Sequence, residues 1–193
     1  MKLKSFLTSH FEAGCDEAGR GCLAGPVVAA AVILPKGYSN KQLNDSKKIS
    51  EKIRNQLRLD IEKKAKAIGI GIVDEKKIDQ INILQASILA MHIAIKNLNT
   101  VPKHLIIDGN RFNSYPNISH DCIVKGDSKF MNIAAASIIA KTKRDDIMKG
   151  LAEKYPEFNW HQNKGYPTKK HRMAIFEYGT SEYHRKSFKV SRT

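Results

Sequence analysis

Short, fully apolar runs alternate along this chain with longer stretches of helical periodicity. The clearest run, residues 27–34, lies between Gly-Pro and Pro-Lys-Gly, which is typical of a buried strand. Further strands are predicted just before Asp16, at residues 69–73, at residues 104–108 and around residues 122–124. These segments are the candidate strands of a sheet.

Four other stretches place apolar residues at helical spacing. Ser50 is predicted to cap the first, whose outer face carries Lys and Arg, and a largely buried second helix runs from about residue 81 to residue 98. A long Ala-rich helix follows, for which Asp127 or Ser128 is the predicted cap. A short helix is predicted over residues 168–179.

The alternation of strands and helices predicts a layered α/β fold. The chain of 193 residues is long enough for one sizeable core and contains neither internal repeats nor a low-complexity linker. We therefore expect one domain over residues 1–193. The N-terminus lacks the apolar run of a signal peptide, and no stretch is expected to approach the roughly 20 apolar residues of a membrane helix.

The charge of the chain narrows the class of partner. Lys and Arg number 33 against 19 Asp and Glu, which gives a formal net charge of +14. This field attracts polyanions, so nucleic acid is the leading partner class, although a lipid surface or an acidic protein would feel the same field. Eight basic and two acidic residues lie within 161–193, which predicts a surface that grips phosphates without reading sequence.

The three cysteines argue against a disulfide framework or a zinc site. Cys15, Cys22 and Cys122 are odd in number and lack the spacing of metal ligands, so a reducing cytoplasmic location is expected. Cysteine catalysis is a weak alternative, because the sequence places no partner histidine beside Cys15 or Cys22. We expect both to be packing residues.

Four acids stand at the ends of predicted elements: Asp16 and Glu17 after the first strand, Asp108 after a later one, and Asp127 before a helix. Strand ends line the functional crevice of open α/β sheets, so the acids are candidates to converge. Side chains of adjacent strand residues point to opposite faces, so Asp16 and Glu17 share a site only where the strand bends or ends. Taken singly, each acid is better explained as a cap, a turn or a solvated bend.

Clustered carboxylates suit hard divalent cations. Mg²⁺ and Mn²⁺ prefer oxygen ligands and neutralise the mutual repulsion of the acids. In a two-metal site one ion readies water for attack while the other, about 3.5–4 Å away, stabilises the departing oxygen. Such chemistry needs several acids and no nucleophilic side chain, so a basic protein with acids in a pocket fits a nuclease.

A long motif adds a more specific signal. Residues 14–27 read Gly-Cys-Asp-Glu-Ala-Gly-Arg-Gly-Cys-Leu-Ala-Gly-Pro-Val, and this segment resembles the opening signature of the ribonuclease HII family. The similarity covers nearly the whole chain. It continues at Asp-Ser-Lys-Lys (45–48), Ile-Asp-Gly-Asn (107–110), Lys-Gly-Asp-Ser (125–128), the helical segment 133–145, Gly-Tyr-Pro-Thr (165–168) and His-Arg-Lys-Ser-Phe (184–188).

The resemblance implies an RNase H-like fold, with a mixed five-stranded sheet flanked by helices and a small basic helical portion at about residues 155–193. It also implies that four acids bind metal and catalyse the reaction: Asp16, Glu17, Asp108 and Asp127. For Asp127, the flexible Gly126 and the competing cap Ser128 leave other acids open as substitutes. These substitutes are Asp121, Asp145 and Asp146.

The resemblance further implies how the substrate is read. The turn Gly19-Arg20-Gly21 recognises the ribonucleotide: glycine lacks a Cβ, so the backbone can approach a 2′-hydroxyl, and Arg20 can hold a phosphate. Tyr166 stacks on the sugar beyond the ribonucleotide, and Lys47 is a further phosphate contact. Without the resemblance, the turn is a simple chain reversal and the tyrosine an ordinary half-buried aromatic.

The implied activity is hydrolysis of the RNA strand of RNA/DNA hybrids and nicking 5′ of ribonucleotides in duplex DNA, with Mn²⁺ or Mg²⁺ as cofactor and 3′-hydroxyl and 5′-phosphate products. A monomer is the default, and no membrane partner is expected. One alternative is the related HIII type, which usually has an extra N-terminal domain for which residues 1–12 leave no room. Another is a non-catalytic basic protein that binds RNA or hybrids, which leaves the acids unexplained.

Overall fold

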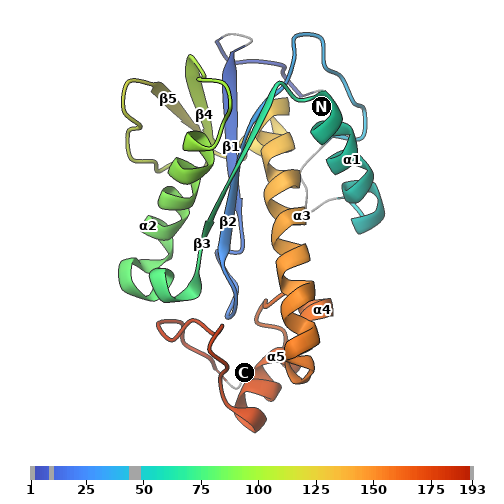
Figure 1. Cartoon of the computed structure of the whole chain (residues 1–193), viewed down its shortest axis with the longest axis vertical. Coiled ribbons are helices and arrows are strands. Elements are labelled where there is room, and N and C mark those ends of the chain that lie inside the picture. Colours follow the sequence, from blue (N-terminus) through green and yellow to red (C-terminus); the bar gives the residue numbers. More distant parts are fainter. Residues whose placement is uncertain (1–2, 9–10, 44–48, 192–193) are drawn as a thin grey trace.

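The computed structural model describes residues 3–8, 11–43 and 49–191. Lys47, predicted as a phosphate contact, and the Asp-Ser-Lys-Lys motif around it lie outside the described residues. Figure 1 shows a central sheet with helices on both of its faces and a smaller helical portion toward the C-terminus. This is the layered α/β arrangement that the alternation of elements predicts.

The sheet contains β1, Glu12–Ala18; β2, Val27–Ile33; β3, Ala67–Val73; β4, His104–Asp108; and β5, Ser119–Ile123. Their order is β3-β2-β1-β4-β5. β2 runs antiparallel to both β1 and β3, whereas β4 is parallel to β1 and β5 is parallel to β4. The prediction of a mixed five-stranded sheet is confirmed, although β5 begins earlier than the apolar run around residues 122–124 indicated.

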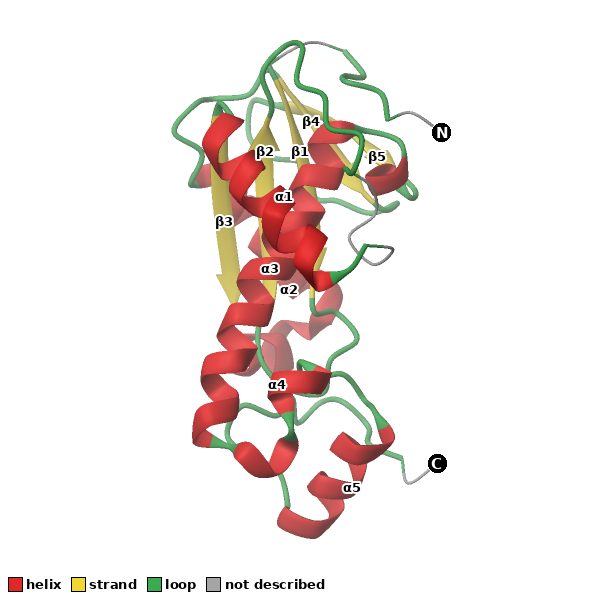
Figure 2. Ribbon diagram, turned by 90° about the vertical axis from the view of Figure 1, so that its right-hand side faces the viewer, coloured by secondary structure: helices red, strands yellow, loops and turns green. Residues whose placement is uncertain are grey.

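Three long helices cover the sheet: α1, Glu51–Lys64; α2, Glu75–Lys96; and α3, Met131–Lys154. α2 packs on one face, and α1 and α3 pack on the other, as Figures 1 and 2 show. Every residue of β2 is buried between these layers, which explains its continuous apolar sequence. The sheet therefore has an apolar cluster on each face.

α3 lies unusually close to β1, and this contact supports the acids that β1 carries. A Cβ on Gly14 would lie 2.2 Å from the backbone carbon of Asn132, so only glycine allows the helix to approach here. The Asn132 side chain donates to the carbonyl of Glu12 at 2.9 Å and accepts from the N–H of Leu34 at 3.1 Å. These buried hydrogen bonds fix the start of α3 against β1 and the end of β2.

α2 differs from its prediction in two respects. It begins at Glu75 with Asp74 as its cap, and it is kinked at Asn82, whose φ of 64° is left-handed. The Asn82 side chain accepts from the N–H groups of Leu84 and Gln85, so it caps the second part, the part that the sequence predicts from about residue 81. By length and composition alone α2 is apolar enough to cross a membrane, contrary to expectation; here it packs on the sheet as a core helix.

Of the two helix caps predicted from the sequence, the one at Ser50 is confirmed. Ser50 caps α1, and Thr168 caps α5, Lys169–Tyr178, each through a side-chain oxygen that accepts a backbone N–H. The prediction that Asp127 or Ser128 caps α3 is wrong. Both residues belong to a separate 3₁₀ turn, Gly126–Ser128, and α3 begins after Phe130, which offers no side-chain cap.

The C-terminal portion packs on the far end of α3. It contains the 3₁₀ turn Pro156–Phe158, α4, Trp160–Asn163, and α5. Its apolar cluster includes Phe158 and Trp160 and is shared with Met148 of α3 and with Leu23 and Ala24 in the loop after β1. The C-terminal residues are thereby joined to the loop that carries the Gly-Arg-Gly turn.

Candidate active site

The strand register brings two of the predicted acids side by side. The last paired residues of β1 and β4 are Cys15 and Ile107, and Asp16 and Asp108 are the next residue of each strand. Neighbouring parallel strands lie about 4.8 Å apart, so the two carboxylates emerge together from the carboxyl ends of the strands. This is the crevice where open α/β sheets bind their ligands.

A cavity of about 320 Å³ opens at this edge of the sheet. It is lined by Asp16, Glu17, Ala18, Gly19, Arg20, Gly21, Asp108, Ser137, Lys141 and Tyr166. A neighbouring cavity of about 190 Å³ on the α2 side is lined by Glu17 and Asp108 as well, together with Leu84, Arg111 and other residues. Asp108 and Glu17 therefore stand between the two hollows.

Asp16 and Glu17 do not require the chain bend that the sequence suggested, because β1 continues through Ala18. Both still line the larger cavity, because β4 ends at Asp108 and leaves that side of β1 open. Asp16 is buried, at 6% exposure, whereas Glu17 is half-buried and forms an ion pair with Arg20 at 3.1 Å. The two acids thus line the same cavity but differ in burial and in hydrogen-bond partners.

Asp127 lies next to the site and is buried, but it is not among the described residues that line the cavities. Its neighbour Gly126 donates its N–H to Asp108 Oδ1 at 2.7 Å, which ties the turn after β5 to the carboxylate at the end of β4. A side chain on Gly126 would collide with Ile133 of α3, which keeps the turn tight. Asp127 is thus held beside Asp108 by the backbone.

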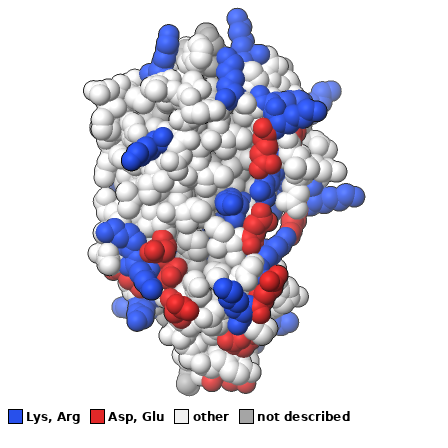
Figure 3. Space-filling view, in the orientation of Figure 1, with Lys and Arg blue, Asp and Glu red and all other residues white. Residues whose placement is uncertain are grey.

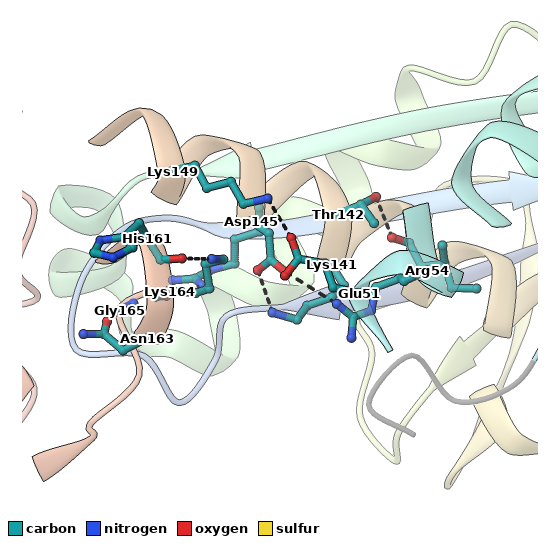
Figure 4. A network of polar contacts seen from close by, with 12 residues as sticks. Glu51, Arg54, Lys141, Thr142, Asp145, Lys149, His161, Asn163, Lys164 and Gly165 are labelled. Atoms are coloured by element: carbon teal, nitrogen blue, oxygen red, sulfur yellow. Dashed lines mark hydrogen bonds and ion pairs between the residues drawn. The ribbon is translucent and has the colours of Figure 1, made fainter. Parts of the chain in front are cut away.

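The three substitutes considered for Asp127 are engaged elsewhere. Asp121 forms an ion pair with His104 at 2.9 Å, and Asp146 pairs with Arg58 at 2.5 Å. Asp145 accepts from Lys141 at 2.6 Å and lies 3.8 Å from Arg54, in the polar network of Figure 4. None of the three lines either cavity among the described residues, and Asp127 does not line them either. Asp127 is the better placed acid because its neighbour Gly126 is bonded to Asp108.

The carboxylates that line the cavity repel one another. Burial raises the pKa of the Asp16 carboxyl well above its usual range, and the neighbouring charges of Glu17 and Asp108 raise it further. A hydrogen bond with Ser137 acts in the opposite direction. Mutual repulsion of this kind is relieved by a divalent cation, so the donor chemistry suits Mg²⁺ or Mn²⁺.

The carboxylates do not by themselves provide a complete set of metal ligands. Within the described residues, no three His, Cys, Asp or Glu side chains are grouped closely enough to hold an ion by themselves. Magnesium usually binds through one or two carboxylates together with waters and substrate phosphates. The open arrangement of Asp16, Glu17 and Asp108 fits that mode, in which substrate completes the coordination.

The Gly19-Arg20-Gly21 turn forms one wall of the cavity, and its two glycines serve different purposes. Gly19 has a φ of +100°, and a Cβ there would lie 2.1 Å from Arg144 Nε, so the fold itself requires glycine. A Cβ on Gly21 would meet nothing within 4 Å, and its φ is outside the left-handed range. Gly21 therefore leaves open space on the cavity side that the fold does not need.

Tyr166 lies on the wall of the cavity and is 37% exposed. Ser137 and Lys141 also line the cavity, although neither was predicted from the sequence. They lie one turn apart on α3, and the Lys141 ammonium stands 5.6 Å from the centre of the Tyr166 ring. Their i, i+4 spacing inside the family-like helical segment was the available signal.

The expected basic surface of the C-terminal portion needs a correction. Arg185 and Lys164 are buried, at 2% and 8% exposure, and donate hydrogen bonds to backbone carbonyls. Both side chains can be buried because backbone carbonyls in the interior accept their hydrogen bonds. Figure 3 shows one face of the molecule, on which Lys and Arg are spread out with acids among them.

The cysteines behave as packing residues. Cys15 and Cys22 are fully buried, and burial raises the pKa of both thiols. A raised thiol pKa lowers the thiolate fraction, which is the opposite of what a cysteine nucleophile needs. Cys122 is exposed and unpaired to another cysteine.

The fold and the acids at its strand ends define the RNase H-like class, and solved structures support this. The ribonuclease H2 of Pyrococcus horikoshii superposes with a TM-score of 0.76 at 26% identity over 94% of this chain and 95% of its own. The RNase HII of Archaeoglobus fulgidus, solved in complex with PCNA, gives a TM-score of 0.75 at 24% identity over 94% of this chain and 96% of its own. A Bst-RNase HIII structure with Mn²⁺ matches less well, with a TM-score of 0.60 at 19% identity over 75% of this chain and 55% of its own.

The sequence comparisons identify the branch within this class. The family model described as Ribonuclease HII matches residues 13–191. The Ribonuclease HII of Bacteroides thetaiotaomicron is 62% identical over 93% of this chain and 90% of its own length, and that of Parabacteroides distasonis is 60% identical over 97% and 94%. The chain belongs to the ribonuclease HII family. It is therefore an endonuclease with ribonuclease H activity, in a family that uses divalent cations, and the non-catalytic alternative is excluded.

Proposed function

We propose that this enzyme nicks duplex DNA on the 5′ side of an embedded ribonucleotide, in addition to cutting the RNA strand of hybrids. The observation that carries the proposal is one cavity in which a Gly-Arg-Gly turn, an exposed tyrosine and three carboxylates meet. A backbone that senses one ribose and a ring that stacks on the next sugar suit an RNA-to-DNA junction. A long RNA strand would not require the second feature.

Asp16, Glu17, Asp108 and Asp127 are proposed to hold Mn²⁺ or Mg²⁺ at the scissile phosphate. When bound, divalent cations supply an activated water and stabilise the departing oxygen, which leaves 3′-hydroxyl and 5′-phosphate ends. The side chains and backbone groups of the protein bind the cations and the substrate and hold them in position. The hydrogen bond from Gly126 fixes Asp108, α3 supports Asp16 through Ser137, and the ion pair with Glu17 holds Arg20 beside the cavity for a phosphate.

The test uses a labelled DNA duplex with one ribonucleotide, incubated with Mn²⁺, Mg²⁺ or a chelator. The wild type is expected to nick 5′ of the ribonucleotide only with a divalent cation. Asp108→Asn can still accept the hydrogen bond from Gly126 but loses a charged metal ligand, so kcat is expected to fall by about 100-fold or more.

Asp121→Asn is the matched control, because Asp121 lies on the adjacent strand β5 and pairs with His104 away from the cavity. Its nicking rate is expected to equal that of the wild type. Cleavage of continuous hybrid without nicking at a single ribonucleotide would refute the proposal while leaving the family assignment intact. Equal loss in both variants would argue that Asp108 acts only through stability.

A further inference from the structure

Two arginines are buried beneath the Gly-Arg-Gly turn, and in the described part of the chain neither forms an ion pair with an acid. Arg144 of α3 is fully buried, and Arg185 of the C-terminal segment is 2% exposed. The hydrogen bonds of both side chains go to backbone carbonyls, mainly in residues 20–26. Each guanidinium also lies over an aromatic ring, Tyr166 for Arg144 and Phe188 for Arg185. Burying a charged guanidinium without a carboxylate partner costs desolvation free energy. We therefore ask what structural role the hydrogen bonds of these two arginines have.

Arg185 spans the two ends of this loop. Its Nε and Nη2 donate to the carbonyl of Gly25 at 3.0 and 2.8 Å, and its Nη1 donates to the carbonyl of Arg20 at 3.0 Å. The planar fork of a guanidinium reaches two acceptors in a fixed geometry, which the ammonium of lysine does not provide. Arg185 therefore fixes the orientation of the peptide between Arg20 and Gly21.

The fixed carbonyl also sets the direction of an N–H group. A trans peptide is planar, so its C=O and N–H point in opposite directions. No cis peptide occurs among the described residues, and the Arg20 carbonyl points to the buried Arg185. The N–H of Gly21 is consequently directed away from Arg185, and Gly21 lines the cavity with open space around its Cβ position.

Without the hydrogen bond from Arg185 to the Arg20 carbonyl, this turn could adopt a second conformation. The N–H of Cys22 lies 3.4 Å from the carbonyl of Gly19, so Arg20 and Gly21 are the central residues of a β-turn. Type I and type II turns differ by rotation of the central peptide, and type II needs a positive φ at the third residue, which glycine adopts readily. Gly21 is not in that range here. The bond from Arg185 to the Arg20 carbonyl holds the type I orientation.

We propose that Arg185 is a positioning residue for ribose recognition: it holds the Arg20–Gly21 peptide so that the Gly21 N–H faces the 2′-hydroxyl in the cavity. The inference rests on the proposed function, since it explains how the turn distinguishes ribose from deoxyribose. Arg185 acts through the backbone of the turn and does not touch substrate itself. A residue that only fastened the C-terminal segment would have no need of the Arg20 carbonyl.

The test compares two duplexes in one assay. The KM is measured for nicking a duplex with one ribonucleotide, and the inhibition constant Ki is measured for an all-DNA duplex used as competitor. In Arg185→Lys the KM is expected to rise about tenfold, because a 2′-hydroxyl hydrogen bond is lost, while the Ki is unchanged because phosphate contacts remain. A partly unfolded preparation would lower the apparent kcat without moving the KM.

Asp79→Ala is the matched control. Asp79 accepts from the N–H groups of Lys186 and Ser187 and from the Ser187 hydroxyl, so it fastens the same segment without contacting the turn. Its KM and Ki are both expected to match those of the wild type. An Arg185→Lys variant in which both constants rise together, or in which neither changes, overturns the inference.

A second measurement needs no variant. In wild-type protein labelled with ¹⁵N, the Gly21 amide resonance is expected to shift when the ribonucleotide duplex is added with a chelator, and not with the all-DNA duplex. An equal response to both duplexes overturns the inference even if Arg185→Lys fails to fold. If the wild type does not nick the ribonucleotide duplex, the proposed function fails; if it nicks and Arg185→Lys keeps the wild-type KM, only the role of Arg185 fails.

Discussion

At the scale of single residues, two glycines two positions apart have opposite reasons to be glycine. Gly19 is constrained by the protein, because its backbone is left-handed and Arg144 occupies the place of a side chain. Gly21 is constrained by nothing in the described protein within 4 Å. The contrast separates Gly19, which the fold requires to be glycine, from Gly21, whose open space we propose is used by the substrate.

We expect Gly19→Ala and Gly21→Ala to show this contrast directly. Gly19→Ala should lower the free energy of unfolding by about 1–3 kcal/mol, because it combines backbone strain with a steric clash. Gly21→Ala should leave stability unchanged or raise it by up to about 1 kcal/mol, yet reduce nicking at a single ribonucleotide. Denaturant unfolding and nicking kinetics on both variants provide the measurement. A Gly21→Ala enzyme with full activity would contradict the assignment of that space to substrate.

At the scale of elements, a pair of buried histidines joins α5 to the C-terminal segment. Trp160 Nε1 donates to His171 Nε2 at 3.0 Å, which leaves His171 Nδ1 to donate to the carbonyl of Tyr166 at 2.9 Å. The N–H of Ser181 donates to His184 Nδ1, and the Nε2 atoms of the two histidines are 3.2 Å apart. In this arrangement His171 Nε2 and His184 Nδ1 accept hydrogen bonds, so both rings are neutral.

Acid should weaken this junction. Burial, followed by unfavourable electrostatic interaction with the neighbouring His171, lowers the pKa of His184 to about 4, against an ordinary value of 6.5. Between these values the unfolded chain binds a proton that the folded protein excludes, so stability is complete above about pH 6.5 and falls as the pH drops toward about 4. The loss is at most about 3 kcal/mol, since one pKa unit corresponds to about 1.4 kcal/mol.

Urea unfolding of the wild type and His184→Asn across this pH range measures the effect. The wild type is expected to lose stability as the pH falls, whereas the variant should start lower and show a flatter pH dependence. Parallel pH profiles for the two proteins would show that His184 does not carry the dependence.

At the scale of the whole molecule, the net charge is +14, and on the face shown in Figure 3 Lys and Arg are spread out with acids among them. Such a surface attracts a polyanion from many directions, while acids line the cavity where the chemistry is proposed. Two of the basic residues that the sequence assigned to this surface, Lys164 and Arg185, hold the fold instead. Affinity for a polyanion should therefore arise from the exposed cations.

Binding of a hybrid duplex is consequently expected to depend strongly on salt. Raising the salt from about 50 mM to about 200 mM should weaken binding by about a hundredfold, because counterions released from several phosphates must be taken up again. Fluorescence anisotropy with a labelled hybrid, in the presence of a chelator to prevent cleavage, gives the slope. A slope near zero would show that phosphate contacts contribute little.

Much of this architecture can be predicted from the sequence because it follows from the local pattern of apolar and capping residues. The apolar run of β2, the cap at Ser50, the short helix that begins after Thr168 and the position of Asp108 at the end of its strand were predicted and are confirmed. The early start of α2 was missed because its first turns carry Lys and Asp rather than an apolar repeat. The cap of α3 was mispredicted because a 3₁₀ turn and a cap share the same short polar residues.

The sequence by itself determined the family, the layered fold and the identity of the candidate acids, because long motifs and periodicity are properties of neighbouring residues. Only the tertiary structure decided how distant residues act together. The register that sets Asp16 beside Asp108, and the burial of Arg185 under a turn 165 residues earlier, depend on contacts that no local pattern records. The same physical distinction separates the two glycines of the turn, since the space around a residue is a property of the folded chain.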